Sequence, residues 1–373
     1  MIDVEQLRRW PDIEAPELLA HDATDRLLLD TVAETAADVL TAHPDGLVVV
    51  GDRYGALTLG SADLVGDGVP RVHQDSLSGE LALAANAARL APDARWGAHD
   101  LDADLIAGAR LVLVQLPRGL DALDEIAELV AAHAHPDVVV LAGGRVKHMT
   151  RAMNDVLSRH FDDVSAGLAR QKSRVLTARR PRRGGAASWP RTSRHDGLVV
   201  VAHGAAFAGS SIDVGTRALL AELGGVAPEA RGVVDLGCGT GVLAVSFALA
   251  RAGAHVVATD QSAAAVASAR LTAEANGVAD RVEVVRDDAA GSLPAGSADV
   301  VLLNPPFHVG ATVHTAIAHK LFEAAARVLR PGGELWCVWN SSLGYRPELS
   351  RVVGPTTQVS RTAKFTVTRS VRR

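Results

Sequence analysis

The stretch that decides the fold is residues 233–245, which read VVDLGCGTGVLAV. The apolar start predicts a buried strand, the glycines Gly237, Gly239 and Gly241 predict a tight turn, and the residues after them have helical spacing. Glycine in such a turn lets the backbone approach a ligand where a Cβ atom would collide. The spacing G-x-G-x-G differs from the G-x-G-x-x-G of dinucleotide-binding folds, and the chain has no G-x-x-x-x-G-K-[ST] phosphate loop.

Strands and helices alternate after this stretch. Apolar runs predict strands at 255–260, 281–288, 298–307 and 332–340, with helices between them near 262–275 and 316–329. Such alternation predicts a doubly wound, mainly parallel α/β sheet.

The first half of the chain repeats this order. It predicts strands at 46–52, 109–119 and 137–145 and helices at 79–89 and 121–133. Asp52 lies 23 residues before Asp75, and Gly237 lies 23 residues before Asp260. We interpret the repeat as an internal duplication, which predicts two tandem Rossmann-like domains. The alternative is that two unrelated α/β domains share a period of this size.

The predicted domains are residues 1–170 and 196–373, joined by a basic linker at 171–195. Between Arg170 and Arg194 the chain has nine basic and no acidic residues, although its net charge is −5. A proline and two glycines interrupt this run, so it cannot be regular structure throughout. Clustered arginines on an acidic protein favour a polyanion, which predicts that the linker contacts phosphates; a solvated connector is the alternative. The candidate phosphate contacts are Arg179, Arg180, Arg182 and Arg183.

Composition narrows the class of protein. The 373 residues are 48% hydrophobic, which is enough for sizeable cores, and the two cysteines exclude a disulfide framework and a multi-cysteine zinc site. The first residues lack the apolar core of a signal peptide, and no apolar run is long enough to span a membrane. We therefore expect a soluble, cytoplasmic protein without a metal or membrane partner. The oligomeric state is left open, and a monomer fits the sequence.

Acidic residues beside the glycine loop indicate which ligand it binds. Asp235 would repel a pyrophosphate but suits a cationic amino-acid group, and Asp260 ends the next strand, where it can accept hydrogen bonds from ribose hydroxyls. These residues resemble the first motif of class I S-adenosylmethionine-dependent methyltransferases, an acidic residue followed by x-G-x-G-x-G. The resemblance implies S-adenosyl-L-methionine as the cofactor, bound by Asp235, Asp260 and the three glycines, with Asp288 contacting the adenine amino group.

The motif Asn304-Pro305-Pro306-Phe307 follows the fourth predicted strand of the second half. Consecutive prolines make a stiff turn without N–H donors, so carbonyl oxygens and the Asn304 side chain remain as acceptors for a planar amino group. Phe307 offers a flat face for a ring. The motif resembles the N/D-P-P-Y/F element of methyltransferases that act on exocyclic or amide nitrogens. That resemblance makes the four residues catalytic candidates and also places Asn304 beside the cofactor.

The first half lacks these motifs. Its loop reads VGDRYGALTLG, and Gln115-Leu116-Pro117-Arg118 stands where the second half has Asn304 to Phe307. We assign the acid Asp75 to the position of Asp260. The N-terminal domain is therefore predicted to be a catalytically silent copy that contributes stability or holds substrate.

The whole chain resembles the bacterial ribosomal RNA guanine-N2 methyltransferases. The resemblance rests on the silent copy, on F-x-x-x-x-(L/I)-D-x-G at Phe207 to Gly215, and on the two motifs above. Details such as GDRYGALT and AKFTVTRS favour the large-subunit enzyme slightly over the small-subunit one. By this resemblance Asp213 and Gly215 help to shape the site, although Asp213 could equally be a helix start.

The resemblance implies a mechanism. A guanine in ribosomal RNA or a ribosomal subunit precursor leaves its stack and lies against Phe307, while Asn304 and the Pro305 carbonyl hold its N2 amino group in line with the methyl group. No general base is evident, and His203 and His308 are more simply structural. The alternatives are methylation of a protein glutamine or of adenine N6, and a non-catalytic RNA-binding scaffold.

Overall fold

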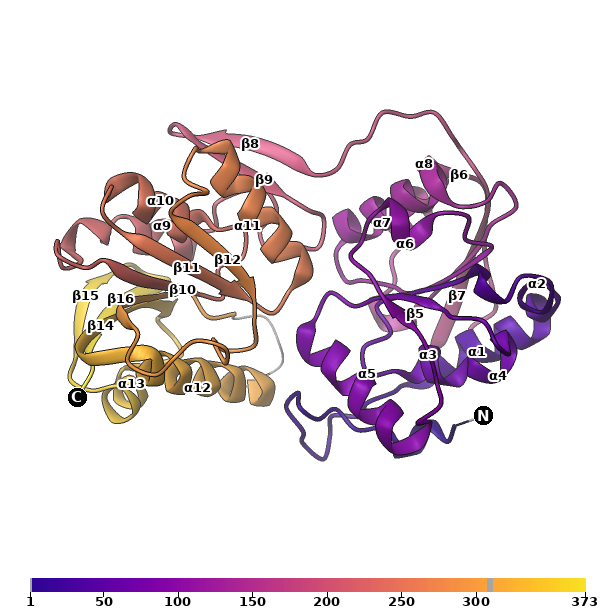
Figure 1. Cartoon of the computed structure of the whole chain (residues 1–373), viewed down its shortest axis with the longest axis horizontal. Helices are drawn as coiled ribbons and strands as arrows, with labels where there is room; N and C mark the ends of the chain where they lie inside the picture. Colours follow the sequence, from indigo (N-terminus) through magenta and orange to yellow (C-terminus); the bar gives the residue numbers. More distant parts are fainter. Residues whose placement is uncertain (1, 307–310) are drawn as a thin grey trace. The chain divides into compact units, whose positions relative to one another are not determined.

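The computed structural model describes residues 2–306 and 311–373, with side chains for all of these except 311–315. Phe307 and His308 therefore lie outside the described residues. The chain forms two compact units, Met1–Trp189 and Pro190–Arg373 (Figure 1). Among the described helices, none is long and apolar enough to cross a membrane.

The N-terminal unit is built on one sheet. Its strands lie in the order β3 (Gly97–Ala98), β2 (Arg71–His73), β1 (Leu47–Val50), β4 (Leu111–Gln115), β5 (Val139–Arg145), β7 (Ser173–Pro181) and β6 (Phe161–Ala166). The pairs from β3 to β5 are parallel, and β7 is antiparallel to both β5 and β6. The helices are α1 (Ala23–Thr35), α2 (Ala37–Ala42), α3 (Ala56–Gly60), α4 (Ala62–Val65), α5 (Leu77–Leu90), α6 (Ala103–Ile106), α7 (Leu120–His133) and α8 (Arg151–His160).

The C-terminal unit repeats this sheet strand for strand. The order is β12 (Val282–Arg286), β11 (His255–Asp260), β10 (Gly232–Leu236), β13 (Ala298–Leu303), β14 (Leu329–Asn340), β16 (Phe365–Val371) and β15 (Thr356–Arg361). Here too the pairs from β12 to β14 are parallel and β16 is antiparallel to its neighbours. The helices are α9 (Val214–Leu220), α10 (Val242–Ala250), α11 (Ala263–Ala275), α12 (Ala311–Val328) and α13 (Arg346–Val352).

A hairpin of β8 (Arg191–His195) and β9 (Leu198–Ala202) precedes the second sheet. It is tied to α11, because the Val201 N–H donates to Thr272 Oγ1 at 3.1 Å. The hairpin therefore belongs to the C-terminal unit.

Helices cover both faces of each sheet (Figure 1). In β1, Leu47 and Val49 pack into the core under α1, α3 and α5, whereas Val48 and Val50 pack into the core under α6, α7 and α8. Side chains of a strand alternate between faces, so a strand with both faces buried must be apolar throughout. The C-terminal sheet is built in the same way, with α9, α10 and α11 on one face and α12 and α13 on the other. The prediction of two tandem Rossmann-like domains is confirmed.

The basic stretch is not a linker, which corrects the prediction for residues 171–195. Residues 173–181 form β7 inside the first sheet, residues 191–195 form β8 of the second unit, and the boundary falls between Trp189 and Pro190. The sequence pattern did not predict this strand, because arginines stand beside its buried positions Ser173, Val175, Leu176 and Ala178. The connection that lacks regular structure is residues 182–189.

Two of the four arginines assigned to phosphates lie in β7, and the other two directly follow it. Arg179 and Arg180 are exposed on β7, Arg182 forms an ion pair with Asp162 at 2.7 Å, and Arg183 donates to the Ala134 carbonyl. Arg182 and Arg183 thus serve the N-terminal unit itself.

Candidate active site

The glycine loop lies at the carboxyl edge of the second sheet, between β10 and α10. Gly237, Gly239 and Gly241 have φ angles of +75°, +54° and +77°, which are left-handed values that favour glycine. A Cβ atom on Gly237 or Gly239 would meet nothing within 4 Å, so these two line an open cradle. A Cβ atom on Gly241 would lie 3.0 Å from the Ala269 Cβ atom of α11. Helix packing therefore requires a glycine at position 241, and its contact with the cofactor remains a prediction.

Asp235 lies beneath this loop, fully buried on β10. Its Oδ2 atom accepts a hydrogen bond from the Ala244 N–H of α10 at 2.9 Å, while Oδ1 has no partner among the described residues. Burial raises the pKa of this carboxyl to about 7. The residue therefore fixes the start of α10 under the loop, a structural task that we did not predict for it.

Asp260, at the end of β11, lies beside the glycine loop and is hydrogen-bonded to its backbone. Its two carboxylate oxygens accept hydrogen bonds from the Gly239 N–H at 3.0 Å and the Ser262 N–H at 2.9 Å. Each oxygen has further lone pairs for a ligand hydroxyl. Backbone N–H groups thus hold the carboxylate beside the glycine loop, and its contact with ribose remains a prediction.

Asp288 follows β12 and forms an ion pair with Lys320 of α12 at 2.5 Å. Its neighbour Asp287 accepts from the Ser292 hydroxyl at 2.6 Å and closes the turn that follows. Lys320 was not among the predicted residues. Its contact with Asp288 joins α12 to the expected adenine position, which remains a prediction.

Asn304, directly after β13, is held in one orientation. Its Nδ2 atom donates to Asp213 Oδ2 and to Thr216 Oγ1, both at 3.0 Å. Its Oδ1 atom is buried and has no donor within the described part of the chain. Both amide hydrogens are thus occupied, and the free acceptor remains for a ligand. This is the acceptor that the sequence interpretation required.

The clamp on Asn304 comes from the start of α9. Asp213 caps this helix by accepting from the Gly215 and Thr216 N–H groups at 2.7 and 3.1 Å. Gly215 is needed because a Cβ atom there would lie 3.3 Å from Asn304 Oδ1. Asp213 therefore starts a helix, as one interpretation held, and it also binds the Asn304 side chain, so that its part in shaping the site remains a prediction. Thr216 was missed, although its place in the D-x-G-T turn is a usable signal.

The glycine loop and Asn304 with its two partners share one small pocket, whose lining does not include Asp235, Asp260 or Asp288. It is lined by the loop residues 237–240, by Asp213, Thr216 and Asn304, and by Phe207 from the segment after β9. Behind Asn304, Pro305 is buried and Pro306 is exposed. His203 lies outside this lining and donates its backbone N–H to Ser268 Oγ at 3.0 Å. In the described ranges no cluster of metal-ligating side chains occurs.

The N-terminal unit has the same loop with other residues. Gly51, Arg53 and Gly55 have φ angles of +77°, +60° and +103°, matching the alternation at Gly237, Gly239 and Gly241. The hydrogen bonds match too: Gly51 donates to the His73 carbonyl as Gly237 does to that of Thr259. Arg53 therefore stands in the place of Gly239.

This register corrects the position assigned to Asp75. Gln74, not Asp75, directly follows His73, as Asp260 follows Thr259, and its Nε2 atom donates to the Arg53 carbonyl at 3.0 Å. The acid that would bind ribose is thus replaced by an amide. Gln115 is matched to Asn304 as predicted, and its amide donates to Asp25 of α1.

Comparison with known proteins agrees with this division. The Methyltransferase small domain family matches residues 197–369, and the RLMG N-terminal domain family matches residues 3–182. A ribosomal RNA large subunit methyltransferase G of Streptomyces coelicolor is 35% identical, with 98% of this chain and 97% of the relative covered. One of Pseudomonas putida is also 35% identical, with 97% and 96% covered.

A solved structure has the same two-unit fold. The Thermus thermophilus 16S rRNA N2 G1207 methyltransferase, solved with AdoMet and guanosine, matches with a TM-score of 0.73 at 22% identity and covers 97% of each chain. The fold, the glycine loop and the family matches define an S-adenosylmethionine-dependent methyltransferase. Its full-length similarity is more specific: the chain belongs to the ribosomal RNA large subunit methyltransferase G family.

Proposed function

We propose that this protein transfers a methyl group from S-adenosyl-L-methionine to the exocyclic N2 amino group of a guanine in large-subunit ribosomal RNA. The observation that carries the proposal is the Asn304 amide, whose hydrogens are both bound by Asp213 and Thr216 while its oxygen is buried and free. A buried acceptor without a donor costs about 1–3 kcal/mol, which a bound amino group would recover. The choice of large-subunit ribosomal RNA as the substrate rests on the names of the relatives. The choice of guanine N2 as the target atom rests on the name of the solved neighbour.

The geometry suits a planar amino group. The two hydrogens of N2 would be accepted by Asn304 Oδ1 and the Pro305 carbonyl, which leaves the nitrogen lone pair perpendicular to the ring plane. In this geometry the lone pair faces a methyl donor placed above the ring plane and leaves conjugation with the ring only as the new N–C bond forms, so the two acceptors contribute orientation. The proton that N2 loses after transfer leaves along one of these hydrogen bonds to water. Phe307 is proposed to stack on the extruded base.

The cofactor fits the residues that are present. The open cradle at Gly237 and Gly239 has room for a ligand against the backbone, and Asp260 faces it with oxygens that can accept further hydrogen bonds. When bound, the cofactor supplies an activated methyl group, so the protein contributes mainly proximity and orientation. Asp260 is proposed to hold the ribose hydroxyls and Asp288 the adenine amino group, with Lys320 fixing Asp288.

The test is the product made by an Asn304→Ala variant. Ribosomal RNA incubated with the wild-type protein and S-adenosylmethionine should contain N2-methylguanosine in the large-subunit RNA, detected by nucleoside mass spectrometry. The variant should lose this product while cofactor affinity, measured by calorimetry, stays within about twofold, because the side chain acts on the target. Asn340→Ala, at the end of the neighbouring strand β14, is the matched control and should retain activity.

Other outcomes would redirect the proposal. Methylated adenine or a methylated protein glutamine as the product would overturn the target assignment. An equal loss of cofactor affinity in Asn304→Ala would move Asn304 into the cofactor site.

A further inference from the structure

The catalytic pocket has two exposed cations close to Asn304. Lys364 lies in the turn between β15 and β16, and Arg217 lies on α9. β16 begins where β14 ends, at the carboxyl edge of the second sheet, because Phe365 pairs with Asn340. The turn that contains Lys364 is therefore at the edge of the sheet that carries the glycine loop.

Lys364 is joined to the pocket through one aromatic ring. A Cβ atom on Gly215 would lie 3.2 Å from Cε1 of Phe365 and 3.3 Å from Oδ1 of Asn304, so the ring and the amide border the same glycine. The Nζ atom of Lys364 lies 5.7 Å from the centre of that ring. A cation over an aromatic face is weakly attracted to it, which holds the ammonium group near the pocket without neutralising it.

Arg217 flanks the same pocket from α9. Its Nε atom donates to the Ile212 carbonyl at 3.0 Å, and Ile212 lines the pocket together with Asp213 and Thr216. Among the described residues, neither Arg217 nor Lys364 has a carboxylate partner. These two rim cations are therefore free to bind an anion.

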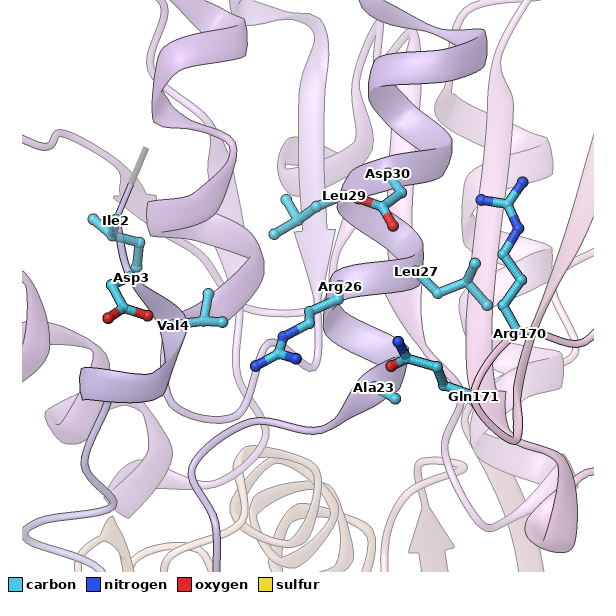
Figure 2. Close-up of a pocket in the computed structure, with 10 residues that line it drawn as sticks. All are labelled: Ile2, Asp3, Val4, Ala23, Arg26, Leu27, Leu29, Asp30, Arg170 and Gln171. Carbon is cyan, nitrogen blue, oxygen red and sulfur yellow. The ribbon is translucent and has the colours of Figure 1, made fainter.

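Several other cations of the chain are neutralised by the protein itself. Figure 2 shows a pocket of the N-terminal unit that has Arg26 and Arg170 in its lining. Arg26 forms an ion pair with Glu5, and Arg170 forms one with Glu34 at 2.9 Å. These arginines stabilise their own unit, whereas the rim cations are not bound in this way.

The catalytic pocket and the loop beside it carry the opposite charge. Asp213 lines the pocket, and Asp260 is hydrogen-bonded to the glycine loop. Carboxylates suit a cationic cofactor but repel the phosphates of an RNA strand. A base that leaves its stack to enter this pocket keeps its flanking phosphates outside, where cations would offset the repulsion. Phe207 lines the same pocket and is 57% exposed, and an aromatic face beside cations is typical of sites for single-stranded nucleic acid.

We propose that Arg217 and Lys364 bind the RNA phosphates on either side of the target nucleotide, so that the strand is held by its backbone while its base is in the pocket. The proposal rests on the proposed function for its choice of RNA and of an extruded base. The terminal nitrogens of Arg217 match the oxygens of a phosphate, and Lys364 supplies a compact point charge. The carboxylate of the cofactor also offers anionic oxygens, and the experiment distinguishes it from a phosphate.

The experiment uses the full chain with Arg217→Gln and Lys364→Gln combined. Affinity for a short fluorescent single-stranded RNA with one central guanine is measured by anisotropy over a range of KCl concentrations. The affinity should fall by about 2–30-fold, the range expected for two solvent-exposed ion pairs. The log–log salt slope should decrease by about 0.7 for each phosphate contact that is lost. Lys364→Gln alone, whose side chain forms no hydrogen bond among the described residues, should change both quantities in the same direction.

A neutral backbone is the matched control for the charge. When methylphosphonates replace the two phosphates that flank the guanine, the wild type should lose affinity by a similar factor, and the double variant should not distinguish the two RNAs. Arg330→Gln is the control variant, because Arg330 is bound to Asp299 at 2.5 Å near the start of β14, at the opposite edge of the same sheet. It should leave affinity and slope unchanged.

The possible results separate the phosphate from the cofactor. Unchanged affinity and slope in the double variant would overturn the proposal, as would an equal loss in Arg330→Gln or a double variant that still distinguishes the two RNAs. A loss of S-adenosylmethionine affinity by calorimetry, with RNA affinity intact, would assign the rim cations to the cofactor carboxylate and overturn the phosphate assignment. Wild-type protein that makes no N2-methylguanosine would contradict the proposed function, whereas the RNA titrations test the rim cations by themselves.

Discussion

The two glycine-type loops have one backbone conformation and opposite chemistry. Both place left-handed residues at alternate positions, and both pack their last glycine against the next helix, Gly55 against Leu83 and Gly241 against Ala269. They differ where a ligand would lie, because Arg53 stands in the place of Gly239. The comparison teaches that the loop shape belongs to the fold, and it predicts that cofactor binding depends on the absence of a side chain at the middle position.

The largest effect is expected from giving the catalytic loop the residue of its twin. Gly239→Arg should lower cofactor affinity by on the order of 100-fold or more, since the side chain would enter the cradle. The unit should still fold, because a Cβ atom there meets nothing within 4 Å and left-handed φ costs about 1–2 kcal/mol. Calorimetry with S-adenosylmethionine and thermal unfolding measure the two quantities. Retained binding would show that the cradle is elsewhere.

The reverse change is the control for that prediction. Arg53→Gly should leave the N-terminal unit without cofactor binding, because Gln74 still stands in the place of Asp260. A second equivalent of cofactor bound by this variant would contradict the comparison.

The next largest effect is expected when Asp260 is replaced by glutamine, the residue that stands in its place in the N-terminal unit. Asp260→Gln should weaken cofactor binding by about 10–100-fold, the value of a hydrogen bond to a charged group. The Gly239 N–H keeps an acceptor in the glutamine, so the loop should survive and the loss should appear in binding rather than in unfolding. Equal cofactor affinities for wild type and variant, by calorimetry, would remove Asp260 from the site.

A smaller effect, on the free energy of unfolding and of equal size in the two units, is expected when the last glycine of each loop is replaced. Gly241→Ala and Gly55→Ala should each lower the free energy of unfolding by about 1–3 kcal/mol, because the added methyl group meets Ala269 at 3.0 Å or Leu83 at 2.8 Å. Urea titration measures this change. Gly253→Ala, with nothing within 4 Å of the added atom, is the control. A destabilisation confined to one unit would contradict the shared role.

The last prediction is a pH dependence of stability shared by two buried acids. Asp235 accepts from the Ala244 N–H of α10, and Asp52 accepts from the Thr58 N–H of α3 at 2.8 Å. Burial raises the pKa of each carboxyl to about 7. The folded protein then binds more protons than the unfolded chain between about pH 4 and pH 7, so stability should fall as the pH rises through this window.

Asp235→Asn and Asp52→Asn should each flatten part of that dependence. Urea titrations at pH 5 and pH 7.5 compare the variants with the wild type. A wild-type stability that rises over this interval, with the same rise in both variants, would contradict the assignment.

Much of the fold could be predicted from the sequence, because apolar runs and glycine turns mark strands and helices locally. The tandem α/β units, the glycine loop and the match of Gln115 to Asn304 all follow from such patterns. The strand β7 was missed because its four buried positions stand beside arginines and do not form a continuous apolar run. The position of Asp260 in the twin was assigned to Asp75, one residue too late, since only backbone hydrogen bonds fix that register.

The candidate site was predictable in its residue types and less so in their partners. Asn304 could be chosen from N-P-P-F, but its clamp by Thr216 depends on α9, which is distant in sequence. The burial of Asp235 under α10 likewise depends on tertiary packing. Local motifs therefore select candidate residues such as Asn304, whereas the contacts that orient them are long-range.

The hydrogen bonds that hold Asn304 also determine which bases the site is expected to exclude. An amide that rotates freely can present either an acceptor or a donor, but Asp213 and Thr216 accept both N–H hydrogens of Asn304 and leave its buried oxygen as the acceptor. A base edge that offers a carbonyl oxygen there would meet a second lone pair, and one that lacks the amino group would leave the acceptor unpaired. A site built to bind an N–H group can reject such analogues by factors of about 10⁴–10⁵. The residues at the start of α9 thus make the pocket select a group that donates a hydrogen bond at this position, before the methyl group is transferred.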